Sequence, residues 1–273
     1  MPAPDVSPIR IESADDERVA DFVGLRDRTG ASRKAASDFF VAESELVVRR
    51  LFTSPFKVRS VLVSPARHEA MKDVIAALRV PVYLAEQEVM RSIAGYDVHR
   101  GVLASARRGP NRTLPDLAVR ATRLLVLEGV NDAENLGAVA RSARALGFHG
   151  LVLDPACADP YSRRAIRVSM GEVLHLPVVR CTKWPDPLDY LNRVGFETWG
   201  LTPADEAVSL YEMGMPTKLA LVAGAEGRGL TQAARARTQV EVRIPMHFAV
   251  DSLNIGHALA IAMAATSPPV GGC

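Results

Sequence analysis

A continuous apolar run at residues 124–127, Leu-Leu-Val-Leu, constrains the fold of this chain more than any other stretch. A strand buried on both faces of a parallel sheet has this pattern, because helices cover both sides of it. A loop rich in turn-forming residues follows, and then a helical pattern over 136–146 that ends at Gly147. Residues 151–153 are typical of the next strand. The segment therefore predicts a βαβ unit whose loop lies at the carboxyl end of its first strand, where open α/β sheets bind ligands.

The rest of this half continues the alternation. Further strands are predicted at 177–179, 197–201, 219–223 and 240–244. Helices are predicted at 160–170, within 184–194 and after Asn254. We therefore expect a parallel sheet with helices on its faces.

The first hundred residues alternate strands and helices in shorter segments. Strands are predicted at 39–42, 58–63, 81–84 and 102–104, and helices at 15–25, 67–78 and 86–93. A further helix ends at Leu51, and we expect Ser44 to be its N-cap. The pattern predicts a small α/β sandwich. A basic stretch with two prolines at 105–116 favours a linker. We expect a disordered N-terminus at 1–10, a first domain at 11–106, a linker at 107–118 and a second domain at 119–273.

Composition excludes several classes of protein. The chain has 273 residues, and 48% of them are hydrophobic, which can support two cores. Cys157, Cys181 and Cys273 form no C-x-x-C pair, so neither a disulfide framework nor a metal site is expected, and a reducing cytoplasm fits. No apolar run has the length of a membrane span, and the proline-rich N-terminus lacks the apolar segment of a signal peptide.

Net charge gives no argument for nucleic-acid binding, because it is only +2. Such binding would need local basic patches. A loop at 26–34 supplies Arg28, Arg33 and Lys34, and the helix at 160–170 supplies Arg163 and Arg167. These side chains can bind phosphates, although solvated surface is an equally good interpretation of each segment.

Two loops in the second half are candidates for a ligand site. The loop at 224–230 follows a strand and has three glycines, which let backbone approach a ligand closely. Its order, G-x-x-G-x-G, is neither the dinucleotide fingerprint nor a Walker loop. In the second loop, Pro245 ends a strand, and Ser252 and Asn254 lie at the start of a helix. Polar groups beside free helical N–H groups suit a nucleotide-like ligand, and an ordinary capped helix is the alternative.

Three motifs in order resemble those of one family. They are Asn135-Leu136-Gly137-x-x-x-Arg141, then Gly224-Ala225-Glu226-Gly227-x-Gly229-Leu230, then Ile244-Pro245-Met246 with Ser252-Leu253-Asn254. Their spacing, across residues 120–267, resembles the SpoU (TrmH-like) branch of the SPOUT RNA methyltransferases. The stretches Phe40-Val41-Ala42-Glu43 and His99-Arg100-Gly101-Val102 are similar, more weakly, to the substrate-binding domain of that family.

The resemblance implies an α/β fold with a deep trefoil knot in the C-terminal domain, at 119–273. It makes the domain at 11–106 an RNA-binding α/β sandwich like those of certain ribosomal proteins. It also implies a homodimer that uses S-adenosylmethionine to methylate a ribose 2′-hydroxyl of RNA. Ribosomal RNA is the expected target, because the N-terminal domain resembles that of rRNA-directed members.

The same resemblance assigns residues. Gly224, Ile244 and Leu253, with Met246 beside them, match the cofactor-binding positions, and Asn135, Arg141, Glu226, Ser252 and Asn254 match the polar active-site set. The chain departs from the family pattern at Ala225, where many members have Asn, and at Gly256-His257, where Ser-Val is common.

Arg141 is the residue to which the family assigns the role of general base. Taking a proton from a guanidinium group at neutral pH is costly. We therefore expect Arg141 to bind the target phosphate and stabilise developing alkoxide charge, with Asn135 and Glu226 positioning it. Ser252 and Asn254 are expected to order the loop and the ribose.

Three alternatives remain open from the sequence. The enzyme could act on tRNA instead of rRNA. The chain could be a non-catalytic RNA-binding protein that keeps the fold, although Arg141, Glu226, Ser252 and Asn254 argue against this. A nucleotide-dependent dehydrogenase lacks the G-x-G-x-x-G turn that it would need.

Overall fold

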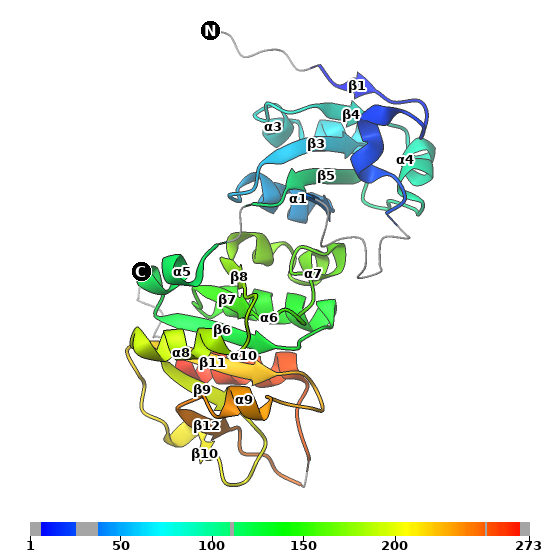
Figure 1. Cartoon of the computed structure of the whole chain (residues 1–273). Coiled ribbons are helices and arrows are strands. Elements are labelled where there is room, and N and C mark those ends of the chain that lie inside the picture. The colour runs from blue at the N-terminus through cyan, green and yellow to red at the C-terminus, as the bar shows by residue number, and fades with distance from the viewer. Residues whose placement is uncertain (1–6, 26–37, 110–111, 249, 268–273) are drawn as a thin grey trace. The chain divides into compact units, whose positions relative to one another are not determined.

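The computed structural model describes residues 7–25, 38–109, 112–248 and 250–267. Its internal contacts divide the chain into two compact units, whose elements are labelled in Figure 1. Unit 1 consists of residues 1–109 and 161–174, and unit 2 consists of residues 110–160 and 175–273. This division differs from the expected domains, because residues 161–174 were expected in the second domain and belong to unit 1.

Unit 1 contains a five-stranded mixed sheet with the order β1-β4-β3-β5-β2. Its strands are β1 (Ile9–Arg10), β2 (Phe39–Glu43), β3 (Val58–Val63), β4 (Val82–Leu84) and β5 (Val102–Arg107). Its helices are η1 (Glu17–Phe22), α1 (Glu45–Phe52), α2 (Pro65–Ala70), α3 (Lys72–Ile75), α4 (Gln87–Ala94) and α7 (Arg163–Val168). Strand β5 is antiparallel to both β2 and β3, whereas β4 is parallel to its two neighbours.

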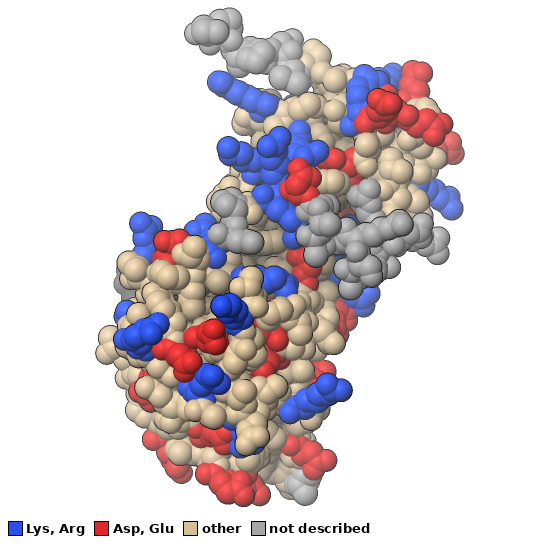
Figure 2. Space-filling view, in the orientation of Figure 1, with Lys and Arg blue, Asp and Glu red and all other residues tan. Residues whose placement is uncertain are grey.

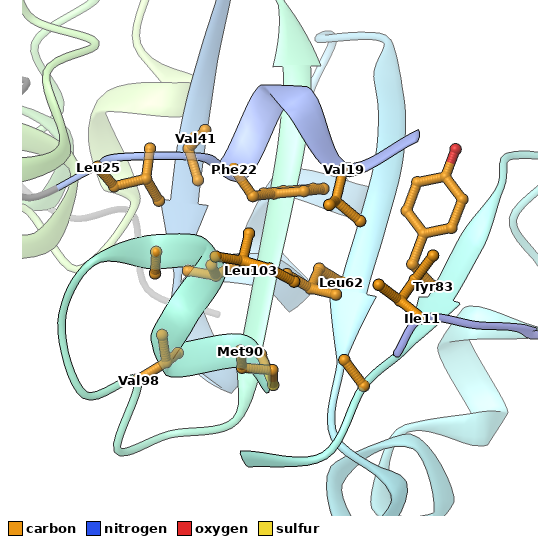
Figure 3. Packing of buried hydrophobic residues seen from close by; sticks show 13 residues of the cluster. Ile11, Val19, Phe22, Leu25, Val41, Leu62, Tyr83, Met90, Val98 and Leu103 are labelled. Atoms are coloured by element: carbon orange, nitrogen blue, oxygen red, sulfur yellow. The ribbon is translucent and has the colours of Figure 1, made fainter. Parts of the chain in front are cut away.

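A hydrophobic core fills the space between this sheet and the helices on one of its faces. Figure 3 shows Phe22 of η1 and Met90 of α4 beside Leu62 and Leu103 of the sheet. All four side chains are fully buried. Burying a side chain of this size contributes about 1.5–3 kcal/mol to folding, so this cluster supports the unit.

Several expectations for the first half need correction. Ser44 occupies the N-cap position of α1, as expected, and its carbonyl accepts from Val48 N, but its φ is +83° and its side chain makes no capping bond. The predicted helix at 67–78 begins earlier, at Pro65, with Ser64 as its cap, and breaks at Met71. The predicted helix at 15–25 is a 3-10 helix, η1.

The expected disordered N-terminus and linker are also partly ordered. Residues 1–6 lie outside the described residues, but Ile9 and Arg10 form β1 and pair with β4. Within the predicted linker, α5 (Leu114–Arg120) begins at a Thr113 cap. Leu117 and Ala118 of this helix are buried in unit 2. Pro115 therefore does not belong to a linker, because it stands in the first turn of a helix, where proline is tolerated.

Unit 2 contains a seven-stranded sheet with the order β10-β12-β9-β11-β6-β7-β8, and every described pair is parallel. Its strands are β6 (Arg123–Glu128), β7 (Gly150–Leu153), β8 (Val178–Arg180), β9 (Glu197–Leu201), β10 (Val208–Ser209), β11 (Leu219–Gly224) and β12 (Val240–Arg243). Besides α5, its helices are α6 (Ala133–Ala145), α8 (Asp186–Arg193), η3 (Leu210–Glu212), α9 (Gln232–Arg235) and α10 (Ile255–Thr266). A last short helix, η2 (Glu172–His175), lies where the chain passes from unit 1 to unit 2.

Helices cover both faces of this sheet. Alternate strand residues such as Val126 and Val222 pack against α5, α8 and α9. Their neighbours along each strand point to the opposite face. Helix α10 packs against α6 and β11, and Figure 1 shows α8 in front of the sheet and α10 behind it. The predicted parallel sheet is confirmed, and its central strands are buried as the apolar run at 124–127 indicated.

Two further expectations concern the whole chain. Among the described residues, no helix is long and apolar enough to cross a membrane. The trefoil knot stays a prediction, because the order of strands in a sheet does not describe how the chain threads.

Candidate functional site

A cavity of about 570 Å³ lies in unit 2 at the carboxyl ends of three neighbouring strands. Leu201 ends β9, Gly224 ends β11, and Ile244 follows β12; all three line the cavity. Ligands of parallel sheets bind at this edge, because the loops that follow the strands converge there. A volume of this size is within the range of small-molecule and cofactor sites.

Asn254 joins the three sequence motifs at this cavity. Its side-chain amide donates to Asn135 Oδ1 at 3.1 Å and to Glu226 Oε1 at 2.6 Å. Its Oδ1 accepts from the backbone N–H groups of Gly256 and His257, so the same residue is the N-cap of α10. Glu226 Oε1 also accepts from Ile255 N at 3.2 Å. Asn254 therefore contacts Asn135, which lies 119 positions earlier in the sequence.

The loop after β11 forms one wall of the cavity, and we call residues 224–231 the glycine loop. It folds back on itself, with Gly229 N donating to Ala225 O at 2.9 Å. A Cβ atom on Gly224 would lie 2.1 Å from the carbonyl carbon and oxygen of Gly229, so no larger residue fits there without a backbone shift. Gly227 and Gly229 have positive φ angles, which glycine adopts readily.

The stretch after β12 forms the other wall, and we call its described residues, 244–248 and 250–254, the closing loop. The structure places all four predicted cofactor-binding residues on the cavity lining, which are Gly224, Ile244, Met246 and Leu253. Ser252 and Asn254 line it as well. Phe248, in the middle of this loop, is 98% exposed and has a φ of +60°.

Arg141 is not part of this arrangement in the single chain. It lies exposed on α6, and we find no hydrogen bond or ion pair to it among the described residues. Asn135 and Glu226 bind Asn254 instead, so the expected positioning of Arg141 by these two residues is absent here. Asn135 lies in the first turn of α6, six positions before Arg141, and the two side chains therefore point in different directions.

Sequence reasoning missed part of the cavity. Leu201, Thr202 and Pro203, at the end of β9, line it, as do Ala258 and Leu259 of α10. The signal for the first three was present, because the strand at 197–201 was predicted and its carboxyl end marks the ligand edge. Nothing in the local pattern showed that β9 would lie between β11 and β12.

The predicted RNA-binding residues have different outcomes. Arg28, Arg33 and Lys34 lie outside the described residues. Arg167 is exposed on α7. On the face shown in Figure 2, positive and negative side chains are interspersed, which agrees with the net charge of +2.

Arg163 has a structural role within unit 1, which corrects its assignment as a phosphate ligand. Its guanidinium donates to Glu43 Oε2 at 2.7 Å, to Leu25 O at 3.0 Å and to the hydroxyl of Tyr96. The guanidinium carbon also lies 4.6 Å from the centre of the Tyr96 ring. These contacts fasten residues 161–174 to the sheet of unit 1.

Comparison with known proteins shows the family of this chain. A sequence model described as the SpoU rRNA Methylase family matches residues 122–264. An uncharacterized tRNA/rRNA methyltransferase of Mycobacterium bovis is 40% identical over 255 residues, which cover 91% of this chain and 88% of the relative. The 23S rRNA (guanosine-2′-O-)-methyltransferase RlmB of Salmonella typhimurium is 31% identical over 77% of this chain and 90% of its own length.

Solved structures share the fold. An AdoMet-bound rRNA methyltransferase from Sinorhizobium meliloti superposes with a TM-score of 0.80 and 23% identity, over 94% of this chain and 96% of that one. The fold and the family match thus define an α/β methyltransferase, and a cavity lies at the carboxyl edge of its parallel sheet. The chain belongs to the SpoU rRNA methylase family.

Proposed function

We propose that this chain transfers the methyl group of S-adenosylmethionine to a ribose 2′-hydroxyl of RNA, with ribosomal RNA as the target class. The single observation that carries this proposal is Asn254, whose side chain joins residues of all three family motifs at the rim of the cavity. The relative RlmB is a 23S rRNA (guanosine-2′-O-)-methyltransferase, which supports both the reaction and the target.

The cavity suits S-adenosylmethionine in size and chemistry. Its volume of about 570 Å³ is sufficient for a nucleoside with an amino-acid tail. Ile244, Met246 and Leu253 offer apolar surface, while Gly224 lets the backbone of Gly229 pack against it in the loop that lines the cavity. These residues would hold the cofactor, and when bound it supplies an electrophilic methyl group.

The chain must then align and activate the ribose oxygen. Arginine stays protonated at neutral pH, so we assign Arg141 to binding the target phosphate and stabilising the developing alkoxide, while the hydroxyl proton passes to that phosphate or to water. Asn254 holds Glu226 and Asn135 in place, and Ser252, exposed on the closing loop, contacts the ribose. Fixing the reactants in line can lower the barrier by about 7 kcal/mol in favourable cases.

An Arg141→Lys variant tests the role of the guanidinium group. Lysine keeps the charge but loses the planar fork, so we expect kcat to fall at least about 100-fold while the cofactor dissociation constant is unchanged. Single-turnover methylation and calorimetry measure the two quantities. Arg144→Lys on the same helix is the matched control and should retain activity. Methyl transfer by Arg141→Lys at nearly the wild-type rate would remove the special role of the guanidinium.

The target can be identified in cells and then reconstituted. Total RNA from deletion and wild-type cells is mapped for 2′-O-methylation, and we expect one rRNA position to lose its methyl group. The purified protein should restore it on RNA from the deletion strain. A lost tRNA position would favour the tRNA alternative, and no lost position together with cofactor binding would favour a non-catalytic RNA-binding protein.

Assembly and location complete the proposal. A homodimer is implied by the family resemblance, and the exposed side chains of Tyr211, Met215 and Val250 offer apolar surface for it. Sedimentation analysis tests it.

A cytoplasmic location agrees with the free thiols of Cys157 and Cys181. Burial raises the pKa of Cys157 to about 12 and that of Cys181 to about 11, so both remain unreactive thiols at neutral pH.

Binding of RNA by unit 1 is the last part of the proposal. Arg167 is exposed on α7, and its side chain is available for a phosphate contact. An Arg167→Glu variant should weaken RNA binding without changing cofactor affinity. Filter binding and calorimetry measure the two.

A further inference from the structure

A buried carboxylate that the reaction does not use lies behind the glycine loop. Glu128 is the last residue of β6 and is 5% exposed. Its Oε1 accepts hydrogen bonds from Trp184 Nε1 and, at 2.7 Å, from Thr231 Oγ1, and its Oε2 accepts from Thr231 N at 2.8 Å. A buried carboxylate is tolerated when donors surround it, and these three donors all belong to the protein.

Glu128 contacts both ends of the glycine loop. Its backbone is in register with Gly224, the residue at which the loop begins. Its side chain binds Thr231, the residue at which the loop ends and α9 is capped. One residue of the neighbouring strand therefore contacts the chain where the loop begins and where it ends.

The path of the loop determines what the cavity presents to a ligand. Ala225, Glu226, Gly227 and Gly229 line the cavity, and Glu226 bonds to Asn254 across it. Because the backbone of Gly229 lies directly over Gly224, a small change at Thr231 would move both the loop backbone and the Glu226 side chain.

We propose that Glu128 is a positioning residue of the methyltransferase site, which fixes the glycine loop in the conformation that binds the cofactor. This inference rests on the proposed function. A carboxylate is required because all three partners are donors. Glutamine has one acceptor oxygen, and its amide would point a donor at another donor. Alanine would remove the acceptor of all three hydrogen bonds.

Trp184 supplies a matched control. It lies between β8 and α8, outside the glycine loop, and its indole N–H contacts the same carboxylate. A Trp184→Phe variant removes this donor but leaves both bonds from Thr231 to Glu128. If Glu128 acts through the loop, the two variants will differ in cofactor binding even where both lower thermal stability.

The experiment compares wild type, Glu128→Gln and Trp184→Phe in three measurements. Calorimetry with S-adenosylmethionine should show dissociation constants that are about 10- to 100-fold higher for Glu128→Gln and within about 2-fold for Trp184→Phe. In steady-state methylation, Glu128→Gln should raise the KM for the cofactor and leave the KM for RNA unchanged. Hydrogen exchange without ligand should be faster at residues 225–231 in Glu128→Gln than in either other protein.

The outcomes separate this inference from the proposed function. Unchanged exchange of the loop in Glu128→Gln, or equal losses of cofactor affinity in the two variants, would overturn the positioning role. Failure of the wild-type protein to bind S-adenosylmethionine would overturn the proposed function, and faster loop exchange would then still establish that Glu128 holds the loop. Faster exchange with an unchanged dissociation constant would contradict the link between the loop and the cofactor.

Discussion

The two loops that form the walls of the cavity differ in how well hydrogen bonds within the single chain hold them. The glycine loop is fixed by Glu128 at both ends and by a bond between its own residues. In the closing loop, among the described residues between Met246 and Leu253, the one hydrogen bond that we find is a long contact of 3.5 Å from Val250 N to His247 O. Asn254 is where the two walls meet.

This contrast indicates that the two loops have different roles in ligand binding. A loop that is preorganised costs no ordering free energy when a ligand binds, so it suits the constant part of the reaction, the cofactor. A loop with few internal contacts gains its order from what it binds. We therefore expect the glycine loop to be formed in the free protein, and the closing loop to become ordered with cofactor, RNA or a second copy of the chain.

The largest effect should come from Gly224→Ala in the fixed wall. The new Cβ would collide with the backbone of Gly229 at 2.1 Å and with Leu230 N at 2.4 Å, so the loop must move. We expect cofactor affinity to fall at least about 100-fold and stability to fall by about 1–3 kcal/mol. Gly214→Ala is the control, because its Cβ meets no atom within 4 Å. Wild-type affinity in Gly224→Ala, measured by calorimetry, would show that this wall is not rigid.

A smaller effect on stability should separate Asn254 from Ser252. Asn254→Ala removes the N-cap of α10 and the bonds to Asn135 and Glu226, so it should lower stability by about 1–2 kcal/mol. Ser252→Ala should leave the melting temperature unchanged, since its side chain has no partner among the described residues. Both variants should slow methyl transfer. Equal losses of melting temperature would contradict the contrast between the two walls.

The smallest effect is expected at Phe248. Its φ of +60° is unfavourable for an aromatic residue, and its side chain is 98% exposed and gains little from packing. Phe248→Gly should therefore raise stability by up to about 1 kcal/mol and change cofactor affinity less than about 2-fold. Urea denaturation measures the first. A clear loss of stability would mean that the closing loop is already packed in the free protein.

Sequence patterns predicted most of unit 2 correctly. Buried hydrophobic residues recur at a fixed period along a strand or helix, and this period can be recognised within a short stretch of sequence. The run at 124–127 became the centre of β6, and the pattern at 136–146 became α6 within a few residues. The failures have local causes too. The prolines predict a linker at Pro115, although the Thr113 cap favours a helix, and Ser44 stands at the predicted N-cap position without making the expected side-chain bond.

What the sequence by itself determined is therefore the parallel sheet, the order of its motifs and the residues that line much of the cavity. Only the tertiary structure decided that Asn254 meets Asn135, that Glu128 holds the glycine loop, and that residues 161–174 belong to unit 1. The physical reason is that periodic burial encodes each element separately. Strand order decides which loops converge at a sheet edge and which donors surround a buried charge. The periodicity of hydrophobic residues in the sequence does not encode strand order.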